Sequence, residues 1–130
     1  MSLFRTLEYL IPGLSIADAV VQDVGAGAYI SQWNRPEPQP TPSEIAAAEL
    51  PAAKHWRTAA NRAECSRRIF ERYPAGRQLS ALAGLYDSAN VATMTDWISD
   101  MVAAENTAAD AIEAATTVQA VEAVTVAWPA

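Results

Sequence analysis

Few residues of this 130-residue chain have side chains suited to catalysis, and they are far apart in sequence. The only histidine, His55, and the only cysteine, Cys65, lie ten residues apart on one predicted helix, a rise of about 15 Å that prevents contact within it. An active site would need a nucleophile and a base within reach, or paired carboxylates in a pocket. We find no such set and expect no catalytic residues and no enzyme. His55 is expected at the surface beside Trp56, and Cys65 as a buried or half-buried side chain.

Metal and phosphate sites find little support in the sequence. Asp96 and Asp100 share a helix face at a spacing of four residues and could hold a cation with help from Glu105, but a solvated acidic face is the preferred interpretation. Gly25 and Gly27 do not form a phosphate loop, because no helix and no lysine follow them. A single thiol allows no internal disulfide and no zinc site built from cysteines. We therefore expect no metal and no cofactor.

The charge distribution argues against nucleic acid as a partner. The net charge is −6, whereas binding to phosphates needs clustered Lys and Arg. Residues 43–77 carry seven Lys or Arg against four Glu, and the chain from residue 78 onward has seven carboxylates and no Lys or Arg. The basic segment could fold against the acidic one or meet a partner of opposite charge, although solvated faces with weak surface pairing are the simpler interpretation.

Membrane insertion and secretion are also not expected. No run of about eighteen apolar residues is present, and the N-terminus lacks a basic region followed by a long apolar one. We expect a protein that is made and used in a cytosol-like compartment, with no membrane partner.

Residues 1–35 predict a small α/β head. Apolar residues at helical spacing favour a helix over Leu3–Leu10, which Pro12-Gly13 ends. Two strand-like segments follow, Ala19–Asp23 and Ala28–Trp33, and the glycines between them supply the positive φ angles of a tight reversal. In the second strand Tyr29, Ser31 and Trp33 alternate with their neighbours, so one face of this β-hairpin is expected to present the aromatic rings.

A proline-rich linker over residues 36–42 separates the head from a helical body over residues 43–130. Four prolines in the eight residues from Arg35 favour an extended strut, with a ligand for an aromatic groove as the alternative. The body predicts a helix that starts at Glu44, capped by Thr41 or Ser43, and runs to about Arg72, either kinked or divided at Pro51. Two further helices and a short C-terminal one follow. The expected fold class is mainly α with a small β-hairpin, its body an antiparallel helical bundle.

Two stretches resemble bacteriophage tail proteins. The segment DVGAGAYISQWN (residues 23–34), followed by PQPT (38–41) and Glu44-Ile45, resembles the N-terminal module of small XkdW-like tail proteins. That module has a glycine-containing turn, a Tyr-Ile-x-x-Trp-Asn strand, a proline-rich connector and a helix. Val24 and Ala26 stand where the family often has acidic or polar turn residues, which argues against a metal-binding turn here. The segment RIFERYP (68–74), with Trp97 and the end from Ile112 to Pro129, is similar to the helical region of tail-fibre and tail-fibre-assembly proteins.

This resemblance implies a structural or fibre-associated tail protein that acts by docking to tail-fibre or baseplate subunits, assembled in the host cytoplasm and carried in the virion tail. The alternative is a tail-fibre assembly chaperone that is absent from the mature particle. A wall-cleaving enzyme is a third class, which lacks a catalytic set. A homo-oligomer is left open.

Aromatic and apolar side chains of the head and the C-terminal end are the candidate partner contacts, since such residues carry much of the energy of interfaces. For Trp33 an equally weighted alternative is that it closes a small core over the first helix. Trp128 is interpreted as either a lid on the bundle or an exposed contact. The candidates are Tyr29, Ile30, Trp33 and Trp128.

Overall fold

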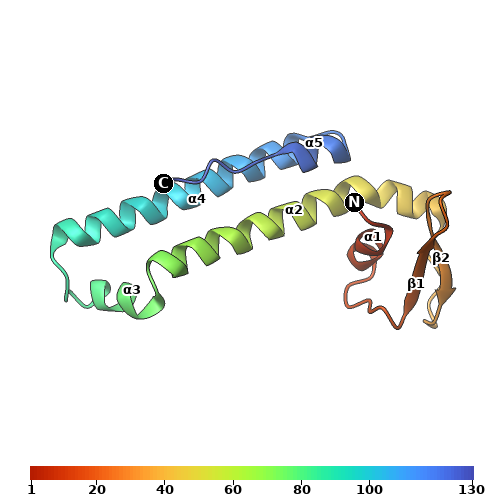
Figure 1. The fold of residues 1–130 in the computed structure, drawn as a ribbon, viewed down its shortest axis with the longest axis horizontal. Coiled ribbons are helices and arrows are strands. Elements are labelled where there is room, and N and C mark those ends of the chain that lie inside the picture. The colour runs from red at the N-terminus through yellow and green to blue at the C-terminus, as the bar shows by residue number, and fades with distance from the viewer.

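The computed structural model describes all 130 residues, and 62% of them are helical. Its only sheet is an antiparallel pair of strands, so a mainly α fold with a small β-hairpin is confirmed. Figure 1 shows an elongated molecule with the sheet near one end and a helical turn at the other. None of the helices has the length and hydropathy that crossing a membrane requires. In chain order the elements are α1 (Leu3–Leu10), β1 (Ala19–Asp23), β2 (Ala28–Trp33), α2 (Pro42–Arg72), α3 (Ala75–Leu82), α4 (Ser88–Ala114) and α5 (Val118–Ala123).

The turn of the β-hairpin is built by one side chain and two glycines. The Asp23 carboxylate accepts hydrogen bonds from the backbone N–H of Gly25 at 2.8 Å and of Gly27 at 3.3 Å. Both glycines have positive φ, at 97° and 104°, a region that other L-residues rarely occupy. The turn predicted from the glycines is therefore confirmed.

A β-bulge in β2 makes the expected aromatic face wrong. Val20 pairs with Gln32 but Val21 pairs with Ile30, which leaves Ser31 as an extra residue without a partner. The extra residue shifts the alternation, so that Ile30 and Trp33 both pack toward the core of the head while Tyr29 is exposed. That core contains Leu7 of α1, fully buried, together with Leu14 and Ala19.

The connector after β2 is held against the head. The Trp33 indole N–H donates to the Glu37 carbonyl at 2.7 Å, and the Asn34 side chain donates to the Ala17 carbonyl at 2.9 Å. The Arg35 guanidinium binds Glu37 and lies 3.5 Å from Asp18. Its hydrogen bond holds the pKa of the Glu37 carboxyl below its usual value. This stretch is thus a packed connection, and the division into domains at residues 36–42 stays a prediction.

Helix α2 is one continuous helix. Thr41 caps it, accepting from the Glu44 backbone N–H at 3.1 Å, while the Glu44 carboxylate accepts from the Thr41 N–H at 3.4 Å. Pro51 lies inside the helix and does not divide it. A proline removes one helical hydrogen bond, here the one to the Ala47 carbonyl, and because Ala47 is exposed, water can bind that carbonyl.

The body consists of two long helices, α2 and α4, that run antiparallel side by side (Figure 1). Helix α3 lies at the turn between them, where Leu79 and Leu82 are exposed, so it does not complete the bundle of three body helices that the sequence predicts. Ala81 is the only buried residue of α3, so this helix contributes little apolar area to the body. Instead α5 packs on α2, and the extended residues 124–130 run back along the long helices.

Acid sensitivity is expected at the outer face of α2. Hydrogen bonds from Arg67 at 2.8 Å and Arg68 at 2.7 Å lower the pKa of the Glu64 carboxyl from 4.5 to about 2. A lowered pKa in the folded state stabilises the fold above the unfolded pKa, and this contribution is lost as the pH falls toward 2. Glu64→Gln is therefore expected to lower the Tm at pH 6 and to match the wild-type protein near pH 2. Thermal unfolding by circular dichroism at several pH values measures this. Asp110→Asn, in an exposed residue of α4 without an ion pair, serves as the control, and an equal pH dependence in both variants would contradict the assignment.

Candidate functional site: an apolar groove in the head

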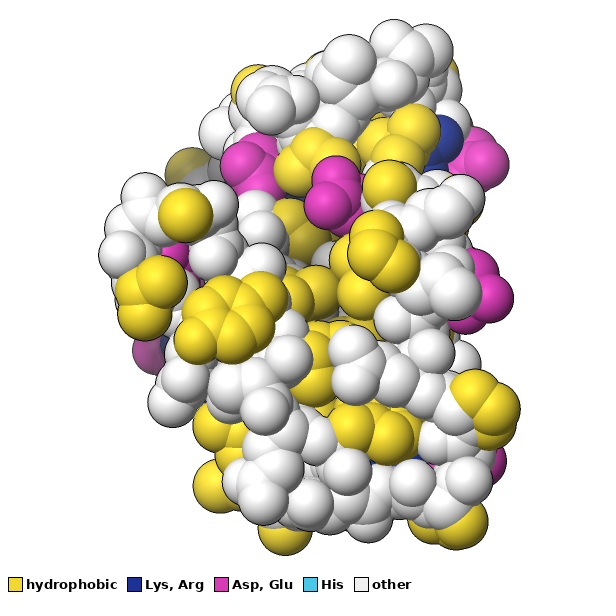
Figure 2. Space-filling view, turned by 90° about the vertical axis from the view of Figure 1, so that its right-hand side faces the viewer, with side chains coloured by type: hydrophobic (Ala, Val, Ile, Leu, Met, Phe, Trp, Pro, Cys, Tyr) yellow, Lys and Arg dark blue, Asp and Glu magenta, His cyan; other side chains and the backbone are white.

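An apolar groove lies between strand β2, the connector and the first turns of α2. Its volume is about 310 Å³. Figure 2 looks at this end of the molecule and shows hydrophobic side chains gathered in a hollow down the middle of the face. The residues that line it are Leu3, Ala28, Tyr29, Ile30, Gln39, Pro40, Pro42, Ile45, Ala46 and Glu49.

The local structure explains how these side chains meet. The capping box begins α2 at Pro42, which places Ile45, Ala46 and Glu49 on one face of its first two turns. Ile45 also packs on the core of the head, so this face is fixed to the hairpin. Glu49 is the only charged residue of the lining, and β2 has no strand on its other edge. The groove thus combines apolar walls, one carboxylate and a free strand edge.

Two of the four predicted contacts line this groove. Ile30 is half-buried between the groove and the core, and Tyr29 is exposed at the wall, where its hydroxyl donates to the Gln22 side-chain oxygen at 3.2 Å. The side chain of Tyr29 is therefore oriented by its neighbouring strand while one side of the ring stays accessible.

Trp33 and Trp128 lie elsewhere. Trp33 is half-buried against the core of the head and does not line the groove, so the small core over the first helix that the sequence offered as an alternative is the one observed. Trp128 is half-buried on the body, where the Arg68 guanidinium lies 5.1 Å from its ring. That cation–π contact helps to hold the C-terminal segment on α2.

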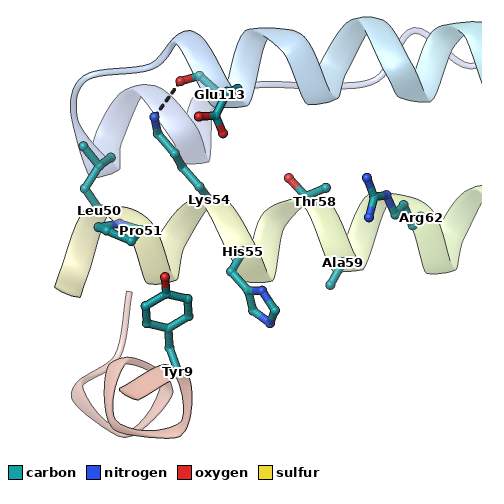
Figure 3. Close-up of a pocket in the computed structure, with 9 residues that line it drawn as sticks. All are labelled: Tyr9, Leu50, Pro51, Lys54, His55, Thr58, Ala59, Arg62 and Glu113. Atoms are coloured by element: carbon teal, nitrogen blue, oxygen red, sulfur yellow. Dashed lines mark hydrogen bonds between the residues drawn. The ribbon is translucent and has the colours of Figure 1, made fainter. Parts of the chain in front are cut away.

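A second, more polar hollow of about 490 Å³ lies along α2 (Figure 3). The Lys54 ammonium donates to the Glu113 carbonyl at 2.6 Å, near the end of α4 where helical carbonyls lack partners. Tyr9 of α1 approaches the exposed His55 ring, with their centroids 5.5 Å apart, and His55 meets Trp56 edge-on as predicted. These contacts fasten α1 and α4 to the same stretch of α2.

The remaining chemical candidates are dispersed. No group of three or more potential metal ligands occurs in the structure, and Glu105 is buried between the long helices rather than beside Asp96 on an open face. Cys65 is buried, and burial together with the charge of Glu105 raises the pKa of its thiol. The prediction that Cys65 is a buried side chain is confirmed.

The sequence analysis missed the groove residues outside β2. Leu3 and Ile45 were visible only as members of helical patterns, and Pro40, which is buried, only as part of a proline-rich strut. Only one feature of the sequence indicated that these segments come together. It is the order of strand, prolines and helix, on which the resemblance to XkdW-like proteins rests. Which side chains face one another depends on the docking of three segments.

The head extends into α2. The Trp56 indole N–H donates to the Arg5 carbonyl at 2.9 Å, and the Arg5 guanidinium lies 4.5 Å from the same ring. Trp56 thus packs on α1 rather than within the bundle. Helix α1, the hairpin, the connector and α2 as far as Trp56 form one packed unit.

Comparison with known families identifies the same unit. Residues 3–57 match the family model described as "XkdW protein". No curated protein and no solved structure matches the chain. The match ends one residue after Trp56, which donates to Arg5 of α1, and the resemblance of the C-terminal region to tail-fibre proteins stays a prediction. Residues 3–57 are therefore similar to the XkdW family, which is associated with phages.

Proposed function

We propose that this protein is a structural or fibre-associated component of a bacteriophage tail, and that it acts by binding another tail protein in the groove of its head. The observation that carries the proposal is the position of the groove, because all of its lining residues fall within the segment that matches the phage-associated family. Apolar grooves with an aromatic wall suit protein partners, since a few such side chains supply most of the binding energy of an interface.

The chemistry of the groove favours an extended segment of the partner. β2 has one edge without a strand, to which an extended chain can add by backbone hydrogen bonds while its alternate side chains enter the groove. Apolar side chains suit walls formed by Ile30, Pro40 and Ile45, and a Lys or Arg nearby would meet Glu49. The partner we propose is thus a tail-fibre or baseplate subunit with an exposed apolar strand and an adjacent basic residue. No step of this role requires catalysis, a cofactor, nucleic acid or a membrane.

Mass spectrometry of density-purified phage particles tests the placement in the tail. A component of the tail is expected to be present at a fixed ratio to the major tail proteins, after assembly in the host cytoplasm. Absence from particles, combined with failure of fibre assembly when the gene is deleted, would contradict this proposal and favour the assembly chaperone, which would use the same groove before leaving.

A matched pair of substitutions tests the groove itself. Ala46 and Ala47 are neighbouring exposed residues of α2, and only Ala46 lines the groove. Ala46→Arg places a long side chain over the apolar walls, where it obstructs the groove and can pair with Glu49 in place of the partner's basic residue, and it is expected to weaken binding of the tail partner at least about tenfold. Ala47→Arg adds the same charge at the next residue of α2, outside the groove, and is expected to leave binding unchanged.

The measurement is co-purification of tail proteins with the tagged variants, followed by titration of the isolated partner. Equal helical circular dichroism of the two variants would show that both fold. Equal binding by both variants would contradict a role for the groove.

A further inference from the structure

The turn between α2 and α4 carries a cluster of large apolar side chains in solvent. We call Leu79, Leu82, Leu85 and Tyr86 the tip patch; the exposed fractions of these side chains are 66%, 84%, 73% and 42%. Four large apolar side chains exposed within eight residues are unusual for a protein that stays monomeric, and such patches commonly mark interfaces. The patch lies at the end of the molecule opposite the head (Figure 1).

Backbone geometry places Leu85 beside the two leucines of α3. Gly84, with φ of 77°, ends α3, and its N–H donates to the Ala81 carbonyl at 3.1 Å. The N–H of Leu85 donates to the Ser80 carbonyl at 3.0 Å. This pair of bonds is a Schellman motif, which folds the residue after the glycine back beside the last turn of the helix. Leu85 is thus returned to the side of α3 that carries Leu79 and Leu82.

The charges beside the tip patch are complementary to those of a second copy. The Arg77 guanidinium lies 6.0 Å from the ring of Tyr86 and makes no ion pair, and Asp87 follows Tyr86 and makes no ion pair either. In an interface with two-fold symmetry, every contact between two different residues occurs twice. A two-fold axis near Tyr86 would bring Arg77 of each copy to Asp87 of the other.

The accessible surface area of the chain is also larger than that expected for a compact monomer of its mass. The accessible surface is 8088 Å², whereas a compact monomer of 13.9 kDa exposes about 6,700 Å². The difference exceeds the roughly 800 Å² that each partner buries in a standard interface. Contact between the α4 helices of two copies would set their exposed carboxylates, such as Asp96 and Asp100, against each other. Contact at the tip avoids this repulsion.

We infer that two copies of the chain form a symmetric dimer through their tip patches. The leucines of the two copies pack together, and Arg77 pairs with Asp87 across the axis at two equivalent places. The heads then lie at the far ends of the dimer with both grooves free, so that one dimer holds two partner segments. The dimer itself does not rest on the proposed function, since its interface uses none of the residues that line the groove.

Sedimentation velocity over a concentration series tests the dimer, with Leu82→Ser as the main variant. The wild-type chain is expected to sediment as a dimer at tens of micromolar. Leu82→Ser is expected to raise the dimer Kd at least about tenfold, since each copy loses a buried leucine. Ile16→Ser is the matched control, because Ile16 is 82% exposed but lies in the head. A wild-type monomer at 100 µM, a trimer, or equal effects of the two variants would overturn the inference.

Exchange of charges tests the symmetry. Arg77→Glu sets two acidic pairs across the axis, and Asp87→Lys sets two basic pairs, so each variant alone is expected to be monomeric. Mixed together, the two restore both opposite-charge pairs and are expected to form a heterodimer. Asp100→Lys makes the same charge change in α4 away from the tip patch and is expected to leave the dimer intact. Helical circular dichroism checks that Asp87→Lys, which removes the cap of α4, still folds. Mixed variants that remain monomeric would overturn the pairing.

Discussion

Leu7→Ala is expected to lower the free energy of unfolding by about 3 kcal/mol, because Leu7 is fully buried at the centre of the head. Its side chain packs with Leu14 and Ala19, and the half-buried Ile30 and Trp33 pack against the same cluster. A hairpin of two strands is barely stable alone in water, so this cluster decides whether the sheet forms. Removal of three carbon atoms leaves a cavity that the short strands and α1 can only partly close.

Urea unfolding followed by circular dichroism and tryptophan fluorescence measures the loss. Trp33 reports on the head in the fluorescence signal, while the long helices dominate the circular dichroism. Ile16→Ala is the control within the same segment, and because Ile16 is exposed it is expected to change stability by less than about 0.5 kcal/mol. Since Ile30 joins the cluster to the groove, Leu7→Ala is also expected to weaken partner binding. A loss below about 1 kcal/mol would contradict the packing described for Leu7.

Features encoded within a few residues could be predicted from the sequence. The glycine turn after Asp23 and the Thr41–Glu44 cap depend on side chains that act on backbone groups two to four residues away. The turn forms as expected, and Thr41 caps α2, which begins at Pro42, two residues before the predicted start at Glu44. The positions of the strands and of the long helices follow in the same way from local periodicity. For the groove, this was enough to find Tyr29 and Ile30 but not the walls opposite them.

Features that depend on pairing between distant segments could not be predicted. The bulge at Ser31 follows from the register of β1 against β2 and reverses the expected direction of Trp33. The bond from Trp56 to Arg5 joins residues 51 positions apart and makes the start of α2 part of the head. No local pattern distinguishes a tryptophan that packs on α1 from one that packs within a bundle, since both fall on an apolar helix stripe.

The burial of Glu105 in the body also depends on packing between distant segments. Unlike the loss of Leu7, replacement of Glu105 is expected to raise the free energy of unfolding. Buried residues of α4 recur at alternating intervals of three and four, as Met101, Glu105, Ala108 and Ile112 do. Glu105 thus occupies a position of the seam between α2 and α4, although its charge suggested a solvated face. Its Oε1 atom is buried without a hydrogen bond, and the nearest cation, Arg62, stands 3.7 Å away with most of its side chain in water.

Glu105→Leu is expected to raise the free energy of unfolding by about 2 kcal/mol, since a buried carboxylate with a poor partner contributes less than a packed leucine. Arg62 remains solvated in the variant, so no new buried charge is left behind. Thermal and urea unfolding measure the gain, and Glu113→Leu, an exposed position of the same helix, is expected to give none.

A second readout separates the charge of Glu105 from its packing. Burial and the Glu105 carboxylate both raise the pKa of the Cys65 thiol, so Glu105→Gln is expected to lower that pKa and to speed alkylation of Cys65 at pH 8.5. If Glu105→Gln speeds alkylation while Glu105→Leu gives no gain in stability, the carboxylate lies near Cys65 and has hydrogen-bond partners in the folded protein. Arg62, whose guanidinium stands 3.7 Å from the carboxylate, is the group to supply them. Glu105 would then serve to align the two long helices rather than weaken them, because only one register of α4 against α2 brings it to Arg62.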